Sequence, residues 1–458
     1  MNKKQLIALA VVLGVIVVGV VGFATVKNMI IKGDPFNHLF YSMTQNSYDS
    51  VEARIEGNIE VDEAMLQSTL YYFTSNPEAM SKFVASLLNE VNITGDVKWA
   101  FSMKDKTVYL DENIHLNYSD KQMLSFGVGY SGERLSLRSQ TFTDKIMVLT
   151  KQEAFDLIRE SSGVDLTEVD FNKYIDLFDL EKDPLYKTFI KDVKGYEKIL
   201  RDKLANLEKG DPKQVVLADG KSIKCDTIEL EMTIDEMTML YIALLNEAKF
   251  DVELKTLVKS KAMAFLTLLK ESGDYKLMNI DASDVDSAMD ELSNNFDSGW
   301  ETAIDELART YQEMQYELQR TQVEPFRYKM LVAIDPKFNI RMVEYSTNMM
   351  GIAVNQTMYY DRFNAKINDG LVFDESKMIS IKKMIDDESY AKDTASTLIE
   401  ESINTFMDSA SLEFFMTDVK AKASVLPAQE ATAIVEMVQY FIDNKEMIKS
   451  MLLENMGM

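Results

Sequence analysis

The chain has 458 residues, of which 46% are hydrophobic and 27% charged, so it can bury one or two cores and is not a disordered chain. Its formal net charge is −25, and so acidic a surface repels nucleic acid and anionic lipid head groups. We therefore expect no nucleic-acid partner. The acidic surface is most simply a source of solubility, and weak binding of calcium or of a polycation is the sharper alternative.

Residues 6–24 form the most apolar segment, nineteen positions without a charge or a strongly polar side chain. About 20 such residues in a helix span a hydrocarbon core of roughly 30 Å, so this segment predicts a transmembrane helix that acts as an uncleaved signal anchor. A cleaved signal peptide is the alternative, with Gly22-Phe23-Ala24 as the small-x-small site.

The flanks of the apolar segment predict its orientation. Lys3 and Lys4 precede it, and Lys27 and Lys32 follow it, so the charge rule gives a tie by count. A four-residue head before an export-type segment still favours a cytoplasmic N-terminus. Cys225 is the only cysteine, which agrees with an oxidising compartment for the large domain. We expect a single-pass protein of the cell membrane with its large domain extracytoplasmic.

No second anchor follows from the sequence. No cysteine directly follows the apolar segment, so the lipid-modified cysteine of a bacterial lipoprotein is absent, and residues 426–430 do not match the LPxTG sorting pattern. The expected division of the chain is a cytoplasmic head (1–5), the membrane helix (6–24), a linker (25–33), an α+β ectodomain (34–370) and a C-terminal helical segment packed on it (371–458).

The first half of the ectodomain predicts a helix, a strand, two helices and an antiparallel meander. A helix is expected from Asp34 to Ser47. From Val51 to Asp62 the odd positions are apolar apart from Gly57 and the even positions are polar, which is the period of a strand with one wet face. Helical spacing returns over residues 63–90, interrupted at Pro77. Short strands that are each apolar on one side follow between Trp99 and Leu137.

Residues 152–209 are helical in pattern, and a second β region follows over 214–234. Asp219-Gly220 predicts a type I′ hairpin turn, and a shift in the apolar alternation predicts a β-bulge near Asp226-Thr227. Thr233 and Glu236 then have the spacing of a capping box that begins a helix.

A helix of about 38 residues is expected over 283–320, and its apolar stripe favours a sheet as the packing partner. A third β region covers 326–360. Helices follow over 379–410 and 427–456, and the acidic residues of the last one exclude a membrane span. The predicted fold class is α+β, with a curved antiparallel sheet, or half-barrel, packed on long helices.

This order of elements resembles the convex-sheet lipid carriers typified by the bacterial lipoprotein chaperone LolA and the LppX-like mycobacterial lipoproteins. The resemblance covers residues 34–365 and is one of pattern. It implies a curved antiparallel sheet that wraps helices, with a cavity for acyl chains between them. The chain also looks like the membrane-anchored surface proteins of Gram-positive bacteria.

Catalytic chemistry has little support in the sequence. Only His38 and His115 exist, and a structural role is the simpler interpretation of both. Cys225 lies on the apolar side of a predicted strand, so we expect its side chain to be buried as a small hydrophobic group. The run Asp281–Asp290 is rich in oxygen ligands but lacks the glycine and glutamate of an EF-hand loop. Neither a zinc ligand set nor a nucleotide-binding motif is present. We expect no cofactor, no metal and no enzymatic activity.

The 29 methionines are the remaining unusual feature. Methionine adapts its shape to irregular apolar ligands, although plain core filling is the simpler alternative. If a cavity for acyl chains exists, the candidates for its lining are methionines on the apolar side of predicted strands or helices near the β regions: Met232, Met237, Met330, Met342 and Met358. Two functions stay open. One is capture of a lipid or another apolar ligand between sheet and helices. The other is a non-catalytic surface protein with a self-filled core and a protein partner.

Overall fold

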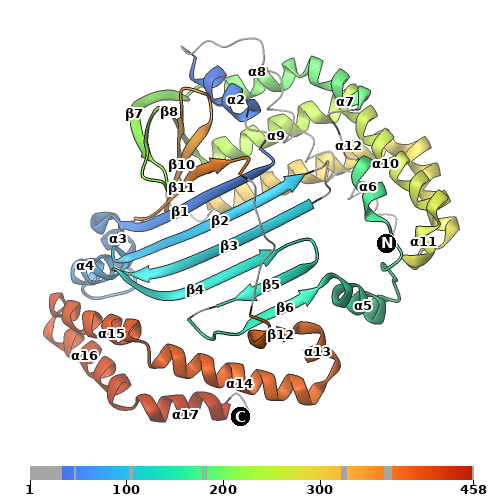
Figure 1. Ribbon diagram of the computed structural model, residues 1–458. Helices are drawn as coiled ribbons and strands as arrows, with labels where there is room; N and C mark the ends of the chain where they lie inside the picture. The colour runs from blue at the N-terminus through green and yellow to red at the C-terminus, as the bar shows by residue number, and fades with distance from the viewer. Residues whose placement is uncertain are drawn as a thin grey trace. The chain divides into compact units, whose positions relative to one another are not determined.

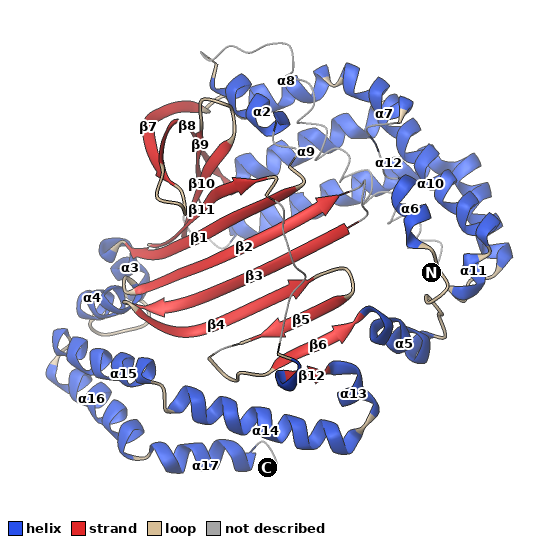
Figure 2. Cartoon of the chain, in the orientation of Figure 1, coloured by secondary structure: helices blue, strands red, loops and turns tan. Residues whose placement is uncertain are grey.

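The computed structural model describes residues 34–45, 48–102, 107–139, 141–177, 180, 183–320, 327–349, 351–365 and 374–455. The chain forms an α+β fold with a twelve-stranded, mostly antiparallel open sheet and many helices, which confirms the predicted class at this level (Figures 1 and 2). The predicted membrane helix of residues 6–24 lies outside the described residues. Among the described helices, none combines the length and apolarity that a membrane span needs.

The chain divides into two compact units. Unit 1 comprises residues 1–48, 102–106 and 155–343, and unit 2 comprises residues 49–101, 107–154 and 344–458. The described helices of unit 1 are α2 (Pro35–Gln45), α6 (Phe171–Leu177), α7 (Pro184–Phe189), α8 (Lys194–Lys203), α9 (Ile234–Phe250), α10 (Val252–Ser272), α11 (Asp274–Leu277) and α12 (Ala282–Arg320), with α5 (Lys151–Ser162) at its boundary. Its strands are β7 (Glu208–Val216), β8 (Ser222–Thr233), β9 (Arg327–Ile334) and the first part of β10 (Ile340–Met349).

Unit 2 holds the longer run of strands and the C-terminal helices. Its strands are β1 (Ser50–Val61), β2 (Val91–Ser102), β3 (Thr107–Tyr118), β4 (Lys121–Tyr130), β5 (Arg134–Arg138), β6 (Ile146–Thr150), β11 (Ile352–Phe363) and β12 (Met378–Ser380). Its helices are α3 (Glu63–Leu70), α4 (Pro77–Leu88), α13 (Ile381–Asp386), α14 (Glu388–Met407), α15 (Ala410–Lys422), α16 (Ala428–Asp443) and α17 (Lys445–Asn455).

Strand β1 joins the two sequence-distant parts of unit 2. It pairs with β2 on one side and with β11 on the other, both antiparallel. The predicted alternation is confirmed at its first half, where Val51, Ala53 and Ile55 are buried. The carboxylate of Asp361 on β11 accepts hydrogen bonds from Arg54 at 2.8 and 3.2 Å, which ties the neighbouring strands on their polar side.

Strand β4 reverses the simple expectation that the apolar side of a strand is the covered one. Phe126, Val128 and Tyr130 alternate along one side and are 50%, 37% and 37% exposed. On the other side Ser125, Gly127 and Gly129 are buried. The reason is local packing: a Cβ at Gly127 would lie 2.7 Å from Asn113 Oδ1 of β3 and 2.8 Å from the Arg138 guanidinium of β5, so polar side chains of the two neighbouring strands lie directly over this glycine.

Helix α15 is joined to the strands of unit 2 by a compact polar cluster. The buried Tyr118 hydroxyl donates a hydrogen bond to Asp418 at 2.5 Å, and Lys422 forms an ion pair with the same carboxylate at 2.7 Å. Lys422 also donates to the carbonyl of Ser86 and lies 3.3 Å from Glu90. Burial opposes ionisation of Asp418, but the bonds from Lys422 and Tyr118 outweigh it and lower its pKa.

The longest helix of unit 1 packs on helices, so the predicted sheet partner of α12 is wrong. Helix α12 spans 39 residues as expected, but it contacts chiefly α9 and α10. Two helices with broad apolar faces supply the area that its stripe needs, and the sequence period of α12 cannot distinguish them from a sheet. The shared core consists of Phe189, Val193, Tyr196, Ala248, Leu254, Leu257, Val258, Phe296, Trp300 and Ile304.

The β7–β8 hairpin has the predicted place but another turn type. Within the loop only Gly220 has a positive φ, of +81°, whereas a type I′ turn needs two such residues. The Leu217 amide donates to the Lys221 carbonyl at 2.8 Å, and the Asp219 carboxylate accepts from the Lys221 amide at 3.1 Å. A three-residue loop with a left-handed glycine therefore closes the hairpin. The bulge lies on β7, between Gly210 and Lys213, instead of on β8.

The turn between β9 and β10 is fixed by a buried ion pair. Asp335 is 4% exposed, and its carboxylate accepts a hydrogen bond from Arg341 at 2.9 Å and two from Asn339 at 2.7 and 3.0 Å. Burial opposes ionisation of Asp335, but these hydrogen bonds lower its pKa. Phe338 occupies the left-handed region of this turn at φ +67° and lies edge-on to His38, 5.6 Å between ring centroids.

Candidate functional site

One wall of the candidate site comes from two neighbouring strands of unit 1. Strands β8 and β9 pair antiparallel with Leu230 opposite Met330 and Met232 opposite Tyr328. Directly opposed residues of an antiparallel pair share a face, and residues two apart on one strand do so too. These four side chains therefore form one continuous apolar surface, on which Leu230 and Met232 are buried.

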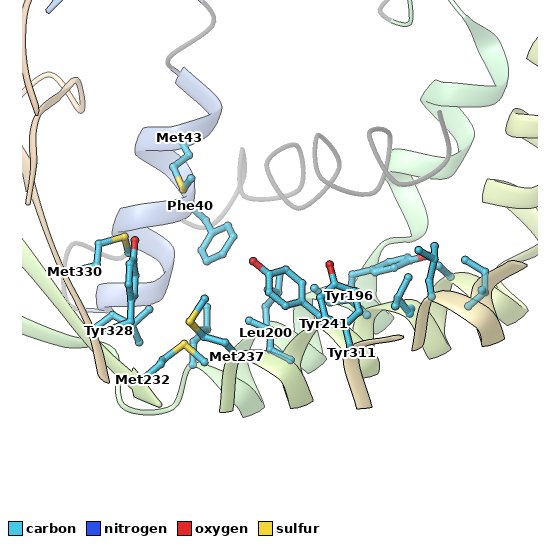
Figure 3. A pocket seen from close by; sticks show the side chains of 18 of the residues that line it. Phe40, Met43, Tyr196, Leu200, Met232, Met237, Tyr241, Tyr311, Tyr328 and Met330 are labelled. Atoms are coloured by element: carbon cyan, nitrogen blue, oxygen red, sulfur yellow. The ribbon is translucent and has the colours of Figure 1, made fainter. Parts of the chain in front are cut away.

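Helix α9 continues this wall without a connecting loop. Thr233 caps the helix: its hydroxyl accepts from the Glu236 amide at 3.2 Å, and the Glu236 carboxylate accepts from the Thr233 amide at 2.7 Å, as the capping box predicts. Because strand and helix share this junction, Met232 at the end of β8 and Met237 in the first turns of α9 face the same space (Figure 3).

Helix α12 lies across α9 and carries the aromatic part of the site. The Trp300 indole is 2% exposed and donates to the Ala248 carbonyl of α9 at 3.0 Å. Farther along the two helices, the rings of Tyr241 and Tyr311 stack with centroids 5.4 Å apart. Tyr241 is 43% exposed, so this stacked pair marks where the site meets solvent.

Helices α2 and α8 provide the remaining side, and an arginine holds them together. Arg201 of α8 forms ion pairs with Asp34 and Glu197, each at 3.0 Å, and its guanidinium lies 4.2 Å from the ring centre of Phe36. Burial disfavours the charged guanidinium, but the two carboxylates raise its pKa. These contacts position Phe40, one turn beyond Phe36, at the pocket.

Together these elements enclose a pocket of about 610 Å³, within the range of small-molecule sites (Figure 3). None of its nineteen lining residues carries a charge, although the chain is 27% charged. The lining consists of Phe40, Met43, Tyr196, Leu200, Leu204, Leu230, Met232, Met237, Leu240, Tyr241, Leu244, Leu245, Ala248, Trp300, Ile304, Leu307, Tyr311, Tyr328 and Met330. Among the described residues, no carboxylate, imidazole, thiol or amine lines it, so this lining is suited to burial of an apolar ligand.

Three of the five candidate methionines meet in this pocket, and two do not. Met232, Met237 and Met330 line it. Met342 is 4% exposed in β10 and contributes to the interior of unit 1 away from the pocket. Met358 lies in β11 of unit 2, opposite Ile55 of β1. The apolar alternation predicts only that all five side chains lie on a covered face. It does not tell which element covers that face, and this element differs from strand to strand.

Sequence reasoning missed the contributions of α2 and α8. The signal in α8 was present, because Tyr196, Leu200 and Leu204 recur every four residues on one helical face. Tyr241 and Tyr311 recur at helical spacing with apolar residues, Tyr241 with Met237, Leu244 and Leu245, and Tyr311 with Leu307 and Met314. A tyrosine on the apolar face of each of two helices that pack together indicates a site with a polar edge, because the tyrosine hydroxyl favours contact with water.

No protein-family model, characterised protein or solved structure matches this chain. The pocket therefore has to be interpreted from its own chemistry.

The other residues considered from the sequence have structural surroundings. Cys225 is fully buried, and burial raises the pKa of its thiol to about 11. His38 is 4% exposed within unit 1. His115 of β3 lies opposite the buried Ser125 of β4 and is itself half-buried. Within the described part of the chain, no three His, Cys, Asp or Glu side chains are grouped as a metal site would require, the Asp281–Asp290 run included.

Proposed function

We propose that this protein is a membrane-anchored extracytoplasmic binding module that captures the apolar chain of a lipid, or a similar apolar ligand, in the pocket of unit 1. The observation that carries the proposal is the uncharged lining of a 610 Å³ pocket between β8, β9 and the helices of unit 1. A core filled by its own side chains leaves no such space. The membrane anchor, residues 6–24, remains part of the proposal.

Binding in such a pocket relies on burial without covalent chemistry. Removing apolar surface from water contributes roughly 25 cal/mol per Å², or about 0.8 kcal/mol for each methylene group. Met232, Met237 and Met330 can follow the shape of a flexible chain, because thioether side chains change rotamer at low cost. A charged head group would lose hydration deep in the pocket, so it would remain at the solvent-exposed end near Tyr241.

In the half-barrel lipid carriers that the sequence resembles, acyl chains lie between a curved sheet and helices, and we propose that the sheet of this chain serves the same purpose. In that proposal β8 and β9 act as the sheet wall and α8, α9 and α12 as the covering helices. Uptake of lipid by an anchored domain outside the membrane would make the protein a carrier or a sensor.

A second function, a non-catalytic surface protein that binds another protein, is supported by one observation. Phe126, Val128 and Tyr130 of β4 are exposed side by side in unit 2. Aromatic residues on an exposed strand face are typical of contact surfaces. This function requires no ligand in the pocket of unit 1, so the two proposals separate in one experiment.

The experiment uses the full chain in proteoliposomes that contain a palmitic acid analogue with a photoreactive diazirine near the end of its chain. After irradiation, mass spectrometry of peptides maps the attached analogue. We expect attachment to peptides of β8, α9 and β9, and competition by unlabelled palmitic acid. The Met232→Trp/Met330→Trp variant fills the pocket, so its attachment should fall to the background.

Met358→Trp is the matched control, because Met358 is a half-buried methionine of a strand that does not line the pocket. It should keep the attachment of the unaltered chain. Attachment that is scattered over both units, or that survives the double substitution, would refute the pocket as the site. In that case the exposed face of β4 becomes the leading candidate, and the search turns to protein partners.

A further inference from the structure

The turn between α3 and α4 of unit 2 exposes three consecutive aromatic side chains. Tyr71, Tyr72 and Phe73 are 71%, 85% and 80% exposed, although each would normally bury most of its ring. The rings of Tyr71 and Tyr72 lie edge to face with centroids 5.8 Å apart. These three residues, the aromatic tip, are not part of the pocket in unit 1.

The chain around the aromatic tip carries no charge. From Ala64 to Pro77 there are fourteen residues without Asp, Glu, Lys or Arg, in a sequence in which 27% of residues are charged. An acidic protein of net charge −25 is repelled by anionic surfaces, so an uncharged aromatic tip offers little to a strongly charged partner. It suits a surface that is neutral overall and partly apolar, since Tyr and Phe settle where water meets hydrocarbon.

Several backbone amides of the tip form hydrogen bonds within the chain, which suits a position with little water. The amide of Phe73 donates to the Leu70 carbonyl at 2.8 Å, and the amides of Tyr71 and Thr74 donate to carbonyls of the preceding turn at 3.1 Å. Because these three amides are paired within the chain, they lose no hydrogen bond to water when the turn leaves bulk water. Asp62 caps α3 through the Met65 amide at 3.1 Å and fixes the base of the hairpin.

A polar hollow of about 460 Å³ adjoins the aromatic tip, lined by residues of α3, α4 and the turn between them, and by Val425. Its charged groups are Glu78 and Lys82, which form an ion pair at 2.7 Å. One negative and one positive group side by side match the paired opposite charges of a zwitterionic phospholipid head group.

We infer that the aromatic tip is a second membrane contact, which inserts Tyr71, Tyr72 and Phe73 into the interface of a bilayer of zwitterionic phospholipid. The head groups of that bilayer lie against Glu78 and Lys82. This contact does not depend on ligand binding in unit 1, but it rests on the proposed membrane anchor of residues 6–24, which would be the first contact. A phospholipid surface is the occupant because it combines an apolar depth for the rings with neutral, dipolar head groups.

The test uses the full chain in phosphatidylcholine proteoliposomes, with an environment-sensitive fluorophore at Ser75→Cys beside the tip. Cys225 is fully buried, so the new cysteine takes the label. Phosphatidylcholine with a nitroxide on its acyl chain serves as a quencher that acts only at short range. We expect a blue-shifted emission that the nitroxide lipid quenches. The matched control carries the label at Met437→Cys on α16. Met437 is an apolar residue that is 65% exposed, as the residues of the tip are apolar and exposed, and a label there should show neither effect.

Two further variants assign the effect to the rings. Replacing all three aromatic residues with serine should abolish the quenching at position 75, whereas Tyr71→Phe/Tyr72→Phe should retain it. Because the three side chains are exposed, the serine variant should keep the circular dichroism spectrum of the parent chain. A label at 75 that stays in water, or quenching that persists without the rings, would overturn the inference. Protection of the label that depends on protein concentration and not on lipid would identify a second copy as the occupant and would also overturn it.

Discussion

The pocket of unit 1 predicts a steep dependence of affinity on the length of an apolar chain. The chain has two tryptophans, and Trp99→Phe leaves Trp300 as the only indole, at the pocket. Trp99 is 36% exposed, so this substitution should leave the fold unchanged. A straight-chain alcohol with bromine at its apolar end would then quench Trp300 when it binds, since bromine acts only on an indole close to it.

The expected size of the effect follows from burial in an uncharged pocket. Each methylene group contributes about 0.8 kcal/mol, which is about a fourfold lower dissociation constant per added methylene. The gain should stop when the chain fills the 610 Å³ space and further methylenes remain in water. A fatty acid of the same length should bind no better than the alcohol, because none of the lining residues can neutralise its carboxylate.

The assay follows Trp300 emission during titration of the Trp99→Phe chain in nanodiscs, with partition into empty nanodiscs as the correction. The pocket-filling Met232→Trp/Met330→Trp variant cannot serve as its control, because it adds indoles, so Met330→Phe with Leu244→Phe takes its place. Dissociation constants that do not change with chain length, or that rise from the shortest alcohol onward, would refute binding by burial in this pocket.

Three predictions concern stability and reactivity. Lys422→Met removes the ion pair with Asp418 and should lower the stability of α15 by about 2 kcal/mol. Amide hydrogen exchange in α15 should then be roughly 30-fold faster, with little change in α12. An increase below about threefold would contradict a stabilising role for the cluster around Asp418. Asp335→Asn should destabilise unit 1 by about 3 kcal/mol, because it breaks the buried pair with Arg341. Because folding lowers the pKa of Asp335, its ionised carboxylate stabilises the fold fully above the unfolded pKa of about 3.9, and this stabilisation is lost as pH falls through the folded pKa. The free energy of unfolding from urea titrations should therefore change less with pH below about 4 in the variant than in the parent. Cys225, buried and with its pKa raised to about 11, should react with iodoacetamide only after unfolding, and modification of the native chain at neutral pH would contradict this.

Local patterns predicted local structure well. The capping box at Thr233 and Glu236, the alternation that begins at Val51 and the extent of α12 all follow from interactions within a few residues, and each is confirmed. The turn after Leu217 was predicted less well, because Asp-Gly fits a type I′ turn and also a three-residue loop. Loop length decides between them, and it depends on the strand register.

Packing partners could not be predicted in the same way. The stripe of α12 fits a sheet or a pair of helices equally well, and only the fold decides in favour of α9 and α10. The same ambiguity explains the candidate methionines. Met330 and Met342 both have apolar phase on strands of one β region, but helices leave space over the first and the interior closes over the second. Covering elements come from distant sequence, so periodicity carries no information about them.

The pairing of β1 with β11 has a consequence for biosynthesis. Arg54 and its partner Asp361 are 307 positions apart, and the whole of the long 155–343 segment of unit 1 is translated between them. At about 5–20 residues per second, ribosomes need roughly 15–60 seconds to supply the missing neighbour. During that interval one side of β1 has no native neighbour, and a nascent chain that is interrupted before residue 352 never obtains one. Until residues 352–363 have been made, we expect the newborn polypeptide to depend on chaperones that cover the unpaired edge of β1, and prematurely terminated products should be substrates for quality-control proteases.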